Sequence, residues 1–189
     1  FVFQGMGGLM SLTGVPEGQP GAGPMKVGVA VADLMTGMYA TTAILAALHE
    51  RSHTGKGRHI DAALFDVQVA MLANQGSNQL IGHKTPTRMG NAHPNIVPYQ
   101  VFPTRDGHMV LAVGNDGQFA KFCGACDHPE VSRDARFATN PARVEHRAAL
   151  VSLLSGWTQQ RDTADWVQRL DVAGVPCSPI LDIAQVMEH

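Results

Sequence analysis

The stretch Gly28-Val29-Ala30-Val31-Ala32-Asp33-Leu34-Met35-Thr36-Gly37-Met38-Tyr39-Ala40, which continues in the same character to Leu48, decides the fold of this chain. From residue 27 to residue 48 nearly every side chain is apolar or small, and Asp33 is the only charged one. A run of this length and composition predicts a helix over residues 32–50. Aspartate just before an apolar run is a preferred N-cap residue, so the first interpretation of Asp33 is the cap of this helix.

A second interpretation of Asp33 is a reactive carboxylate. An ionised carboxylate in apolar surroundings loses hydration, which costs free energy unless the charge is used or satisfied. The two roles are compatible because the positive end of a helix dipole favours an ionised carboxylate. Gly37 lies four residues further on and therefore on the same helix face. The space beside Gly37 admits either a bulky substrate or a closely packed neighbour, and the spacing does not separate the two.

The overall composition excludes several classes of protein. The 189 residues include 14 Lys and Arg against 16 Asp and Glu, which gives a formal net charge of −2. No basic patch indicates a nucleic-acid partner, and no block of like charges indicates a tail. The long apolar run is interrupted by Asp33 and by threonines, so we do not interpret it as a membrane span.

The cysteines indicate a reduced, packed interior. Three cysteines are too few for a disulfide scaffold in a chain of this length, which fits a reducing cytoplasm as the predicted location. Cys123 and Cys126 have the C-x-x-C spacing, but no second pair accompanies them. They fall in a helical pattern in which Cys123 shares a face with Phe119 and Phe122, so packing is the expected role. We expect no metal site.

The segments around the long helix predict an α/β fold. Residues 1–12 predict a short Gly-rich helix, and the Pro- and Gly-rich residues 15–26 predict a loop. After the long helix and a polar turn, residues 58–64 predict a buried strand and residues 65–74 another helix. The order helix, turn, strand, helix is typical of α/β proteins.

The pattern then becomes polar and irregular, and we interpret residues 76–97 as a linker. Within it lies Gly90-Asn91-Ala92-His93, where a Gly-Asn start allows a positive φ. Backbone N–H groups in such a turn can bind an anionic or carbonyl oxygen. The alternative is a connecting loop with an incidental histidine.

Residues 98–189 predict a small α+β domain. Two strands, over residues 97–102 and 108–113, flank the turn Thr104-Arg105-Asp106-Gly107, which indicates a hairpin. Helical patterns follow over residues 118–125, 143–159 and 163–173, and a last one begins at residue 181. The chain starts and stops in the middle of such patterns, so we interpret it as an internal piece of a longer protein.

Taken together, these segments resemble the family III CoA-transferases, the group that includes formyl-CoA transferase and carnitine CoA-transferase. The resemblance covers the whole chain, and its strength lies in the order of the segments rather than in any one motif. The matching segments are Phe3–Gly8 with Thr13-Gly14, Ala32–Gly37, Ala43–Leu48 through Thr54–Gly57, Asp61, Gly90–Pro94 with Pro98-Tyr99, Phe102 with Asp106-Gly107, and Gly174–Pro176 with Pro179-Ile180.

The resemblance implies an α/β fold in which a Rossmann-like large domain is joined to a small α+β domain. Members are about twice as long as this chain, and two subunits form an interlocked homodimer. Residues 1–75 then belong to the large domain and residues 98–189 to the small one. The resemblance implies a CoA thioester as substrate and no permanently bound cofactor. Most contacts to the CoA nucleotide lie, in members, in the portion that precedes this chain.

The family's catalytic aspartate matches Asp33, which implies nucleophilic catalysis by a carboxylate. Asp33 attacks the thioester carbonyl of an acyl-CoA and gives a mixed anhydride and CoA thiolate. The thiolate then forms an aspartyl-CoA thioester, and the acceptor carboxylate takes CoA from it through a second anhydride. One thioester is exchanged for another, so the reaction requires neither ATP nor a metal.

The resemblance also implies roles for residues around the nucleophile. Gly90, Asn91, Ala92 and His93 match the mobile loop that closes over the aspartyl intermediate and excludes water, although relatives have several glycines there. Gly37 would leave space for the thioester. Leu64 matches a position on the path of the pantetheine arm.

Two alternatives stay open. An α-methylacyl-CoA racemase also resembles the chain around Asp33, but it works through an acid/base pair. Racemases follow this aspartate with a Gly-rich stretch and carry a glutamate near residues 113–118, and this chain has neither. The second alternative is a catalytically incomplete fragment that acts only as an interaction or structural piece.

The acceptor acid is suggested by residues 23–30 and 89–102. These segments look most like the branch of the family that acts on dicarboxylates, with succinyl-CoA as donor and glutarate as acceptor. A distal carboxylate needs a cation, and Lys26, Arg88 and His93 are the candidates. Each is equally interpretable as a solvated surface group.

Overall fold

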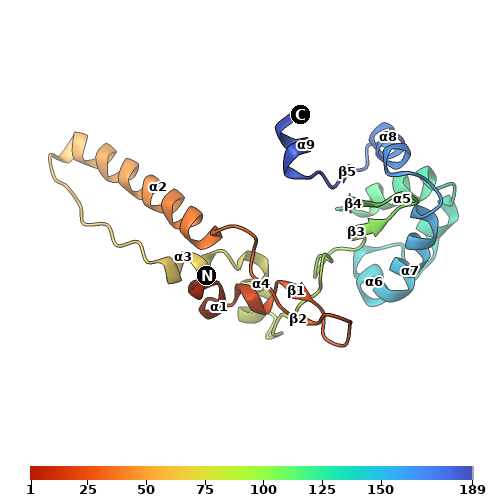
Figure 1. Ribbon diagram of the computed structural model, residues 1–189, viewed down its shortest axis with the longest axis horizontal. Helices are drawn as coiled ribbons and strands as arrows, with labels where there is room; N and C mark the ends of the chain where they lie inside the picture. Colours follow the sequence, from red (N-terminus) through yellow and green to blue (C-terminus); the bar gives the residue numbers. More distant parts are fainter. Residues whose placement is uncertain (189) are drawn as a thin grey trace. The chain divides into compact units, whose positions relative to one another are not determined.

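The computed structural model describes residues 1–188 and divides into two compact units, residues 1–90 and residues 91 onward. We call them the first and the second unit. The first unit is mostly helical (Figure 1). Its elements are α1 (Val2–Met6), the 3-10 turn η1 (Leu9–Ser11), the short strands β1 (Gly14–Val15) and β2 (Gly23–Pro24), α2 (Val31–Thr54), α3 (Leu64–Ala70) and α4 (Ala73–Leu80).

The strands β1 and β2 pair antiparallel, with Gly14 opposite Pro24. Gly14 has a φ of 131°, and a Cβ there would lie 2.1 Å from the carbonyl oxygen of Gly23. Only glycine tolerates both this backbone conformation and this close approach. The turn that precedes the long helix is therefore fixed by a local steric requirement.

Helix α2 is the longest element and lies largely exposed. Gly55, with a φ of 70°, ends it in the left-handed conformation common at helix C-termini. Within residues 1–188, Ala32 is its one buried residue, whereas large apolar side chains stand exposed along it: Leu34, Met38, Tyr39, Ile44, Leu45 and Leu48. By length and composition α2 would also pass as a membrane span, a test that a core helix of a soluble protein passes as well.

The structure corrects four expectations for the first unit. Residues 58–64 form no strand, because a strand needs a neighbour to pair with, and no strand among residues 1–188 pairs with this segment. The helix predicted over residues 65–74 is divided into α3 and α4, with a φ of 47° at Ala73. Helix α4 also occupies the start of the predicted linker. The predicted helix over residues 1–12 is α1 followed by η1.

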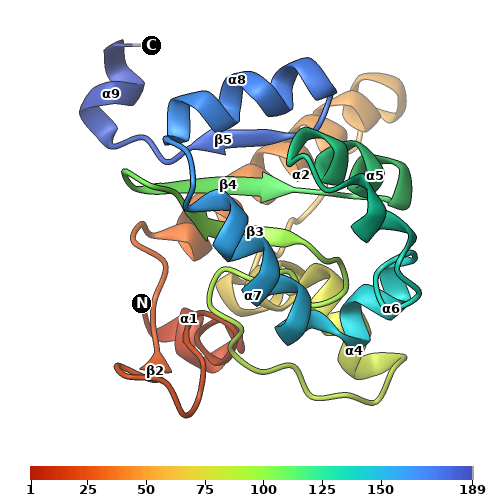
Figure 2. The same ribbon diagram turned by 90° about the vertical axis from the view of Figure 1, so that its right-hand side faces the viewer.

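The second unit combines a small sheet with helices. Its elements are β3 (Tyr99–Pro103), β4 (His108–Ala112), α5 (Asp116–Ala125), the 3-10 helix η2 (Pro129–Arg133), α6 (Asn140–Glu145), α7 (Arg147–Thr158), α8 (Thr163–Ala173), β5 (Cys177–Pro179) and α9 (Ile183–Glu188). The strands form an antiparallel sheet in the order β3-β4-β5. Figures 1 and 2 show α5, α7 and α8 on one face of this sheet.

Most expectations for the second unit are confirmed. The predicted hairpin is β3 and β4, closed by the Thr104 N–H, which donates to the Gly107 carbonyl at 2.9 Å. Helix α8 has the predicted bounds, and α5 covers the helix predicted over residues 118–125. The helix predicted over residues 143–159 is instead divided at His146, where φ is −98° and ψ is 23°, outside helical geometry.

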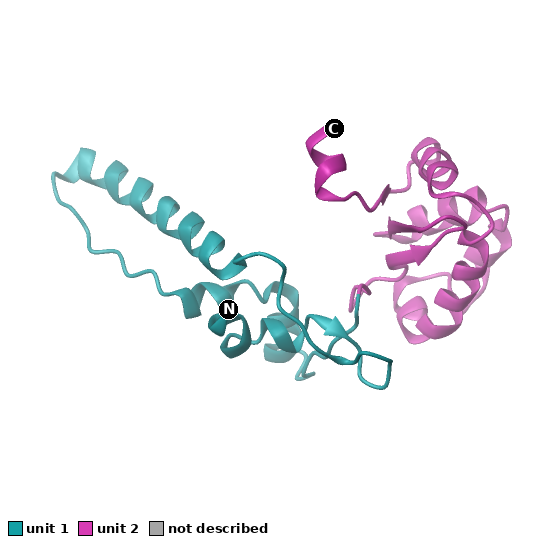
Figure 3. Ribbon diagram, viewed as in Figure 1, with its two compact units in different colours: residues 1–90 teal, residues 91–189 magenta. Residues whose placement is uncertain are grey.

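The boundary between the units falls after Gly90 (Figure 3). The chain from residue 83 to residue 98 forms neither helix nor strand. On the first-unit side, Arg88 Nε donates to the Val15 carbonyl at 3.1 Å, and its guanidinium pairs with Glu17. The residues just before Gly90 are thus attached to β1.

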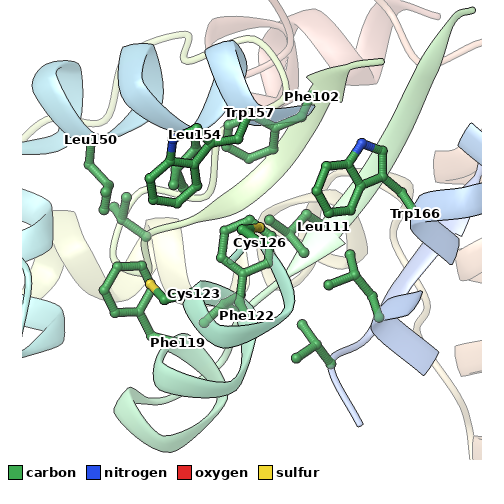
Figure 4. Close-up of a cluster of buried hydrophobic side chains, with 14 of the residues drawn as sticks. Phe102, Leu111, Phe119, Phe122, Cys123, Cys126, Leu150, Leu154, Trp157 and Trp166 are labelled. Carbon is green, nitrogen blue, oxygen red and sulfur yellow. The ribbon is translucent and has the colours of Figure 1, made fainter. Parts of the chain in front are cut away.

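The core of the second unit lies between the sheet and the helices (Figure 4). Burying an apolar side chain of this size stabilises the fold by about 1.5–3 kcal/mol relative to leaving it exposed. The labelled core residues are Phe102, Leu111, Phe119, Phe122, Cys123, Cys126, Leu150, Leu154, Trp157 and Trp166.

Cys123 and Cys126 belong to this core, so the packing interpretation of the C-x-x-C pair is confirmed. Burial raises the pKa of both thiols to about 12, which keeps them protonated at neutral pH. Within the described part of the chain, no group of three or more His, Cys, Asp or Glu side chains is placed to hold a metal ion.

Candidate functional site

Asp33 lies in the first turn of α2 with an exposed side chain. The expectation that it caps the helix is wrong, because the helix starts two residues earlier and its N-cap is Ala30. The Leu34 N–H already donates to the Ala30 carbonyl at 3.0 Å, so Asp33 is the third helical residue. A carboxylate in the first turn still interacts favourably with the positive end of the helix dipole. Within residues 1–188, Asp33 therefore lies exposed at the start of α2 and does not cap the helix.

Gln4 holds the segment that leads into α2. Its side chain is only 2% exposed. The Oε1 atom accepts from the Val27 N–H at 2.9 Å, and Nε2 donates to the Val29 carbonyl at 3.4 Å. These contacts fix the chain six and four residues before Asp33. Gln4 lies in the segment Phe3–Gly8 that resembles the family, but its burial and its two backbone partners follow only from the tertiary structure.

Gly37 lies exposed one turn after Asp33, on the same side of α2. Apart from Gly37 itself, its two chain neighbours and the adjoining backbone of α2, no heavy atom of residues 1–188 comes within 4 Å of the position that a Cβ would take at Gly37. The side of α2 at Gly37 is therefore open within these residues. Within the described chain no neighbouring helix fills that space.

Leu64 is half-buried at the start of α3. A cavity of about 240 Å³ in the first unit does not include Leu64 among its lining residues, which come from α2, from α3 and from the segment between them: Tyr39, Ala43, Ile60, Asp61, Ala62, Ala63, Asp66, Val67 and Ala70. Neither Asp33 nor Gly37 lines this cavity. This cavity of the first unit thus brings together neither Leu64 nor Asp33 nor Gly37.

The loop Gly90–His93 spans the boundary between the units. Gly90 has a φ of 60° and forms a turn with Asn91, so the expected positive φ is confirmed. Gly90 belongs to the first unit, whereas Asn91, Ala92 and His93 belong to the second.

His93 is held by the residues that follow it. Its ring stacks on Tyr99 with the two centroids 5.2 Å apart, and its Nδ1 accepts from the Asn95 N–H at 3.1 Å. Burial and, to a smaller extent, the charge of Arg147 lower the pKa of His93. The ring is therefore neutral at neutral pH, and an accepting Nδ1 places its proton on Nε2. His93 can act as a hydrogen-bond donor through Nε2.

The three side chains considered as cations for the distal carboxylate of an acceptor differ in exposure, in pairing and in protonation. The Arg88 side chain is only 13% exposed and is engaged by Glu17 and Val15. Lys26 is exposed, with Nζ 3.3 Å from the Val27 carbonyl oxygen. His93 is neutral at neutral pH for the reasons given above. Of the three, Lys26 alone is both charged and without a carboxylate partner among residues 1–188.

The comparisons with known proteins agree on one family. The model of CoA-transferase family III matches residues 1–189. The succinate–glutarate CoA-transferase of Agrobacterium fabrum is 48% identical over 186 residues, which are 98% of this chain and 46% of that protein. The human succinyl-CoA:glutarate CoA-transferase is 41% identical over 185 residues, which are 98% of this chain and 41% of that protein.

A solved structure shares the fold. The crystal structure of a CAIB/BAIF family protein from Brucella suis has a TM-score of 0.76 and 50% sequence identity, and the match covers 99% of this chain and 48% of that one. The chain thus spans about half the length of the relatives it matches. Because the family model and these relatives align with nearly every residue, the chain belongs to CoA-transferase family III.

Proposed function

We propose that the protein containing this chain transfers CoA from an acyl-CoA thioester to a carboxylic acid, with Asp33 as the nucleophile. The match to CoA-transferase family III over the whole chain carries this proposal. The exposed position of Asp33 in the first turn of α2 is consistent with attack on a bound substrate. Relatives named for succinyl-CoA and glutarate support a succinyl donor and a dicarboxylate acceptor.

The reaction proceeds by exchange of acyl bonds at Asp33. The carboxylate attacks the thioester carbonyl, the C–S bond breaks, and a mixed anhydride and CoA thiolate result. The thiolate attacks the aspartyl carbonyl, which releases the donor acid as a carboxylate and leaves an aspartyl-CoA thioester. The acceptor carboxylate repeats these two steps in reverse order, forms the new thioester and restores the Asp33 carboxylate.

The neighbouring residues assist through space and hydrogen bonding. The open side of Gly37 accommodates the thioester, and Leu64 borders the path of the pantetheine arm. The loop Gly90–His93 closes over the intermediate, where backbone N–H groups and the Nε2–H of His93 donate to the developing oxyanion. Closure also keeps water from the anhydride.

The assembly follows the same proposal. Residues 1–75 form part of a Rossmann-like large domain, residues 98–189 form the small domain, and two full-length subunits interlock as a homodimer in the cytoplasm. The double length of the relatives supports a larger first domain. The free state of Cys123, Cys126 and Cys177 is consistent with a reducing compartment.

The experiment that tests the proposal uses the full-length protein with succinyl-CoA and glutarate. Hydroxylamine added during turnover should convert Asp33 into a hydroxamate that mass spectrometry locates, and Asp33→Asn should reduce transfer to background. Asp165→Asn is the matched control, because Asp165 is also an exposed aspartate in a first helical turn. Normal transfer by Asp33→Asn would refute the nucleophile. Deuterium exchange at the α-carbon without CoA transfer would indicate a racemase instead.

A further inference from the structure

The segment from His93 to Pro98 has neither helix nor strand pairing, and side chains of α6 and α7 bind its backbone. Asn140 binds it at two points: Nδ2 donates to the Asn95 carbonyl at 2.8 Å, and Oδ1 accepts from the Val97 N–H at 3.1 Å. The side-chain amide thus makes hydrogen bonds to this backbone that a neighbouring strand would make in a sheet. The segment is held by contacts that reach across more than forty residues of sequence.

Two arginines extend this set of contacts. Arg143 Nε donates to the Val97 carbonyl at 2.6 Å, and Arg147 Nη2 donates to the Pro94 carbonyl at 2.8 Å. We call Asn140, Arg143 and Arg147 the clamp. Between Pro94 and Val97 the clamp occupies three carbonyl oxygens and one N–H group.

Arg143 is the member of the clamp whose side chain is completely buried. Its side chain is 0% exposed, and its guanidinium lies 4.5 Å from the centre of the Phe119 ring. A buried charge is costly unless it is paired and its hydrogen bonds are satisfied. Nη1 donates to the Phe137 carbonyl at 2.9 Å and Nη2 to Asp116 Oδ1 at 2.8 Å, while Nε is used on Val97. All three guanidinium nitrogens of Arg143 have an acceptor only while the Val97 carbonyl lies in this position.

The clamp fixes one end of the loop Gly90–His93, and Arg88 fixes the other. Arg88 attaches the preceding residues to β1, as described above. Only Met89 to His93 lie between the two anchors, and Gly90 supplies the turn. Arg88 is attached within the first unit and the clamp within the second, so each anchor restricts the conformations of the loop at its own end.

His93 connects the clamp to the loop. Its own N–H donates to the Tyr99 carbonyl at 2.9 Å, and the next residue, Pro94, carries the carbonyl that Arg147 binds. The charge of Arg147 also reaches the imidazole and helps to lower its pKa. The clamp therefore holds the residue that follows His93, and Arg147 places a positive charge near its ring.

We propose that Asn140, Arg143 and Arg147 are positioning residues that hold His93–Val97 in the conformation in which the loop Gly90–His93 covers the reacting thioester. This inference rests on the proposed CoA transfer and assigns part of the control of that reaction to α6 and α7. A loop that covers an anhydride must exclude water, because water competes with the acceptor carboxylate. Loosening the clamp should divert acyl groups from transfer to hydrolysis.

The test uses Asn140→Ala in the full-length protein, since Arg143→Ala would leave buried partners unsatisfied and endanger folding. The substitution removes both amide contacts and leaves the Asn140 backbone N–H on Asp116. We expect faster hydrogen exchange at the Val97 amide and a roughly tenfold rise in the ratio of succinyl-CoA hydrolysis to transfer, equivalent to ~1.4 kcal/mol in relative barriers. Arg147→Ala should act in the same direction, and Arg147→Lys should restore part of the ratio because it keeps a donor.

The ratio separates positioning from a loss of folded protein. A variant that merely unfolds lowers hydrolysis and transfer together and leaves their ratio unchanged. Arg133→Ala, at an exposed arginine on η2, should change neither the exchange nor the ratio.

Two results would overturn the inference. Unchanged exchange at Val97 in Asn140→Ala would show that the clamp does not hold the segment. Faster exchange with an unchanged ratio would show that the segment is held but that its position does not matter to the reaction. Failure of the proposed function is distinguishable, because the unmodified protein would then transfer no CoA while the exchange measurement would still report on the clamp.

Discussion

The two units bury very different amounts of apolar surface. Within residues 1–188, the buried apolar residues of the first unit are Ala32 and Val67, whereas the core of the second unit contains 16. Both units are rich in apolar residues, but those of the first unit line α2 and stand exposed. Exposed apolar surface of this extent marks a face that another surface covers. The unit carrying Asp33 therefore depends on further contacts, whereas the second unit has a core of its own.

The largest expected effect comes from separating the units. Residues 91–189 alone should unfold cooperatively in urea, with a free energy of unfolding within the roughly 5–15 kcal/mol common for domains. Residues 1–90 alone should show no cooperative transition, because they lack a core. Fluorescence of Trp157 and Trp166 follows the second unit, and far-ultraviolet circular dichroism follows the first. A cooperative transition of residues 1–90 would contradict the expectation that the first unit lacks a core of its own.

A matched pair of leucine substitutions, one in each unit, measures the difference in apolar burial between the two units. Leu154→Ala in the core of the second unit should cost about 2–5 kcal/mol of unfolding free energy, because it leaves a cavity. Leu45→Ala on α2, where Leu45 is 61% exposed, should change the stability of this chain by about 0.5 kcal/mol or less. Urea unfolding of the 189-residue chain measures both. In the full-length protein, a cost at Leu45 similar to that at Leu154 would show that the remaining sequence buries α2.

Gly37→Ala is expected to separate stability from activity. Alanine in a helix interior is about 0.5–1 kcal/mol more favourable than glycine, and the structure leaves room for its Cβ. If that room serves the thioester, transfer by the full-length protein should fall roughly tenfold, or ~1.4 kcal/mol. Gly156→Ala in α7, which has equally open surroundings, is the control and should gain stability without losing activity. Full activity of Gly37→Ala would exclude the proposed role of the glycine.

The smallest expected effect is on the titration of His93. Burial and the charge of Arg147 hold its pKa below the ordinary value of 6.5, so Arg147→Ala should raise it. Between the lowered pKa and 6.5 the unfolded chain binds more protons than the folded one, so stability should fall as the pH decreases through this window. Titration of the imidazole by NMR measures the shift, with Arg133→Ala as the control. An unchanged or lower pKa in Arg147→Ala would contradict the described geometry.

Local pattern predicted the second unit better than the first. The hairpin and helix α8 carry their own signals, a polar turn between alternating residues and an apolar face of helical period. Residues 58–64 carry a strand pattern as well, yet they form no strand, because a local pattern does not tell whether another strand lies alongside to pair with it. The sequence pattern does not predict the break at His146 for a similar reason, since an apolar period continues across it.

For the candidate site, the sequence by itself determined the residue types: one carboxylate in an apolar run, a glycine four residues later, and a Gly-Asn turn before a histidine. It also determined the family, through the order of its segments. Only the tertiary structure decided that Asp33 is the third residue of α2 rather than its cap. The structure alone also revealed that Gln4 holds the entry to α2 and that Asn140, Arg143 and Arg147 hold the end of the loop. These contacts join residues more than twenty positions apart, and local periodicity contains no information about which distant backbone groups a polar side chain will satisfy.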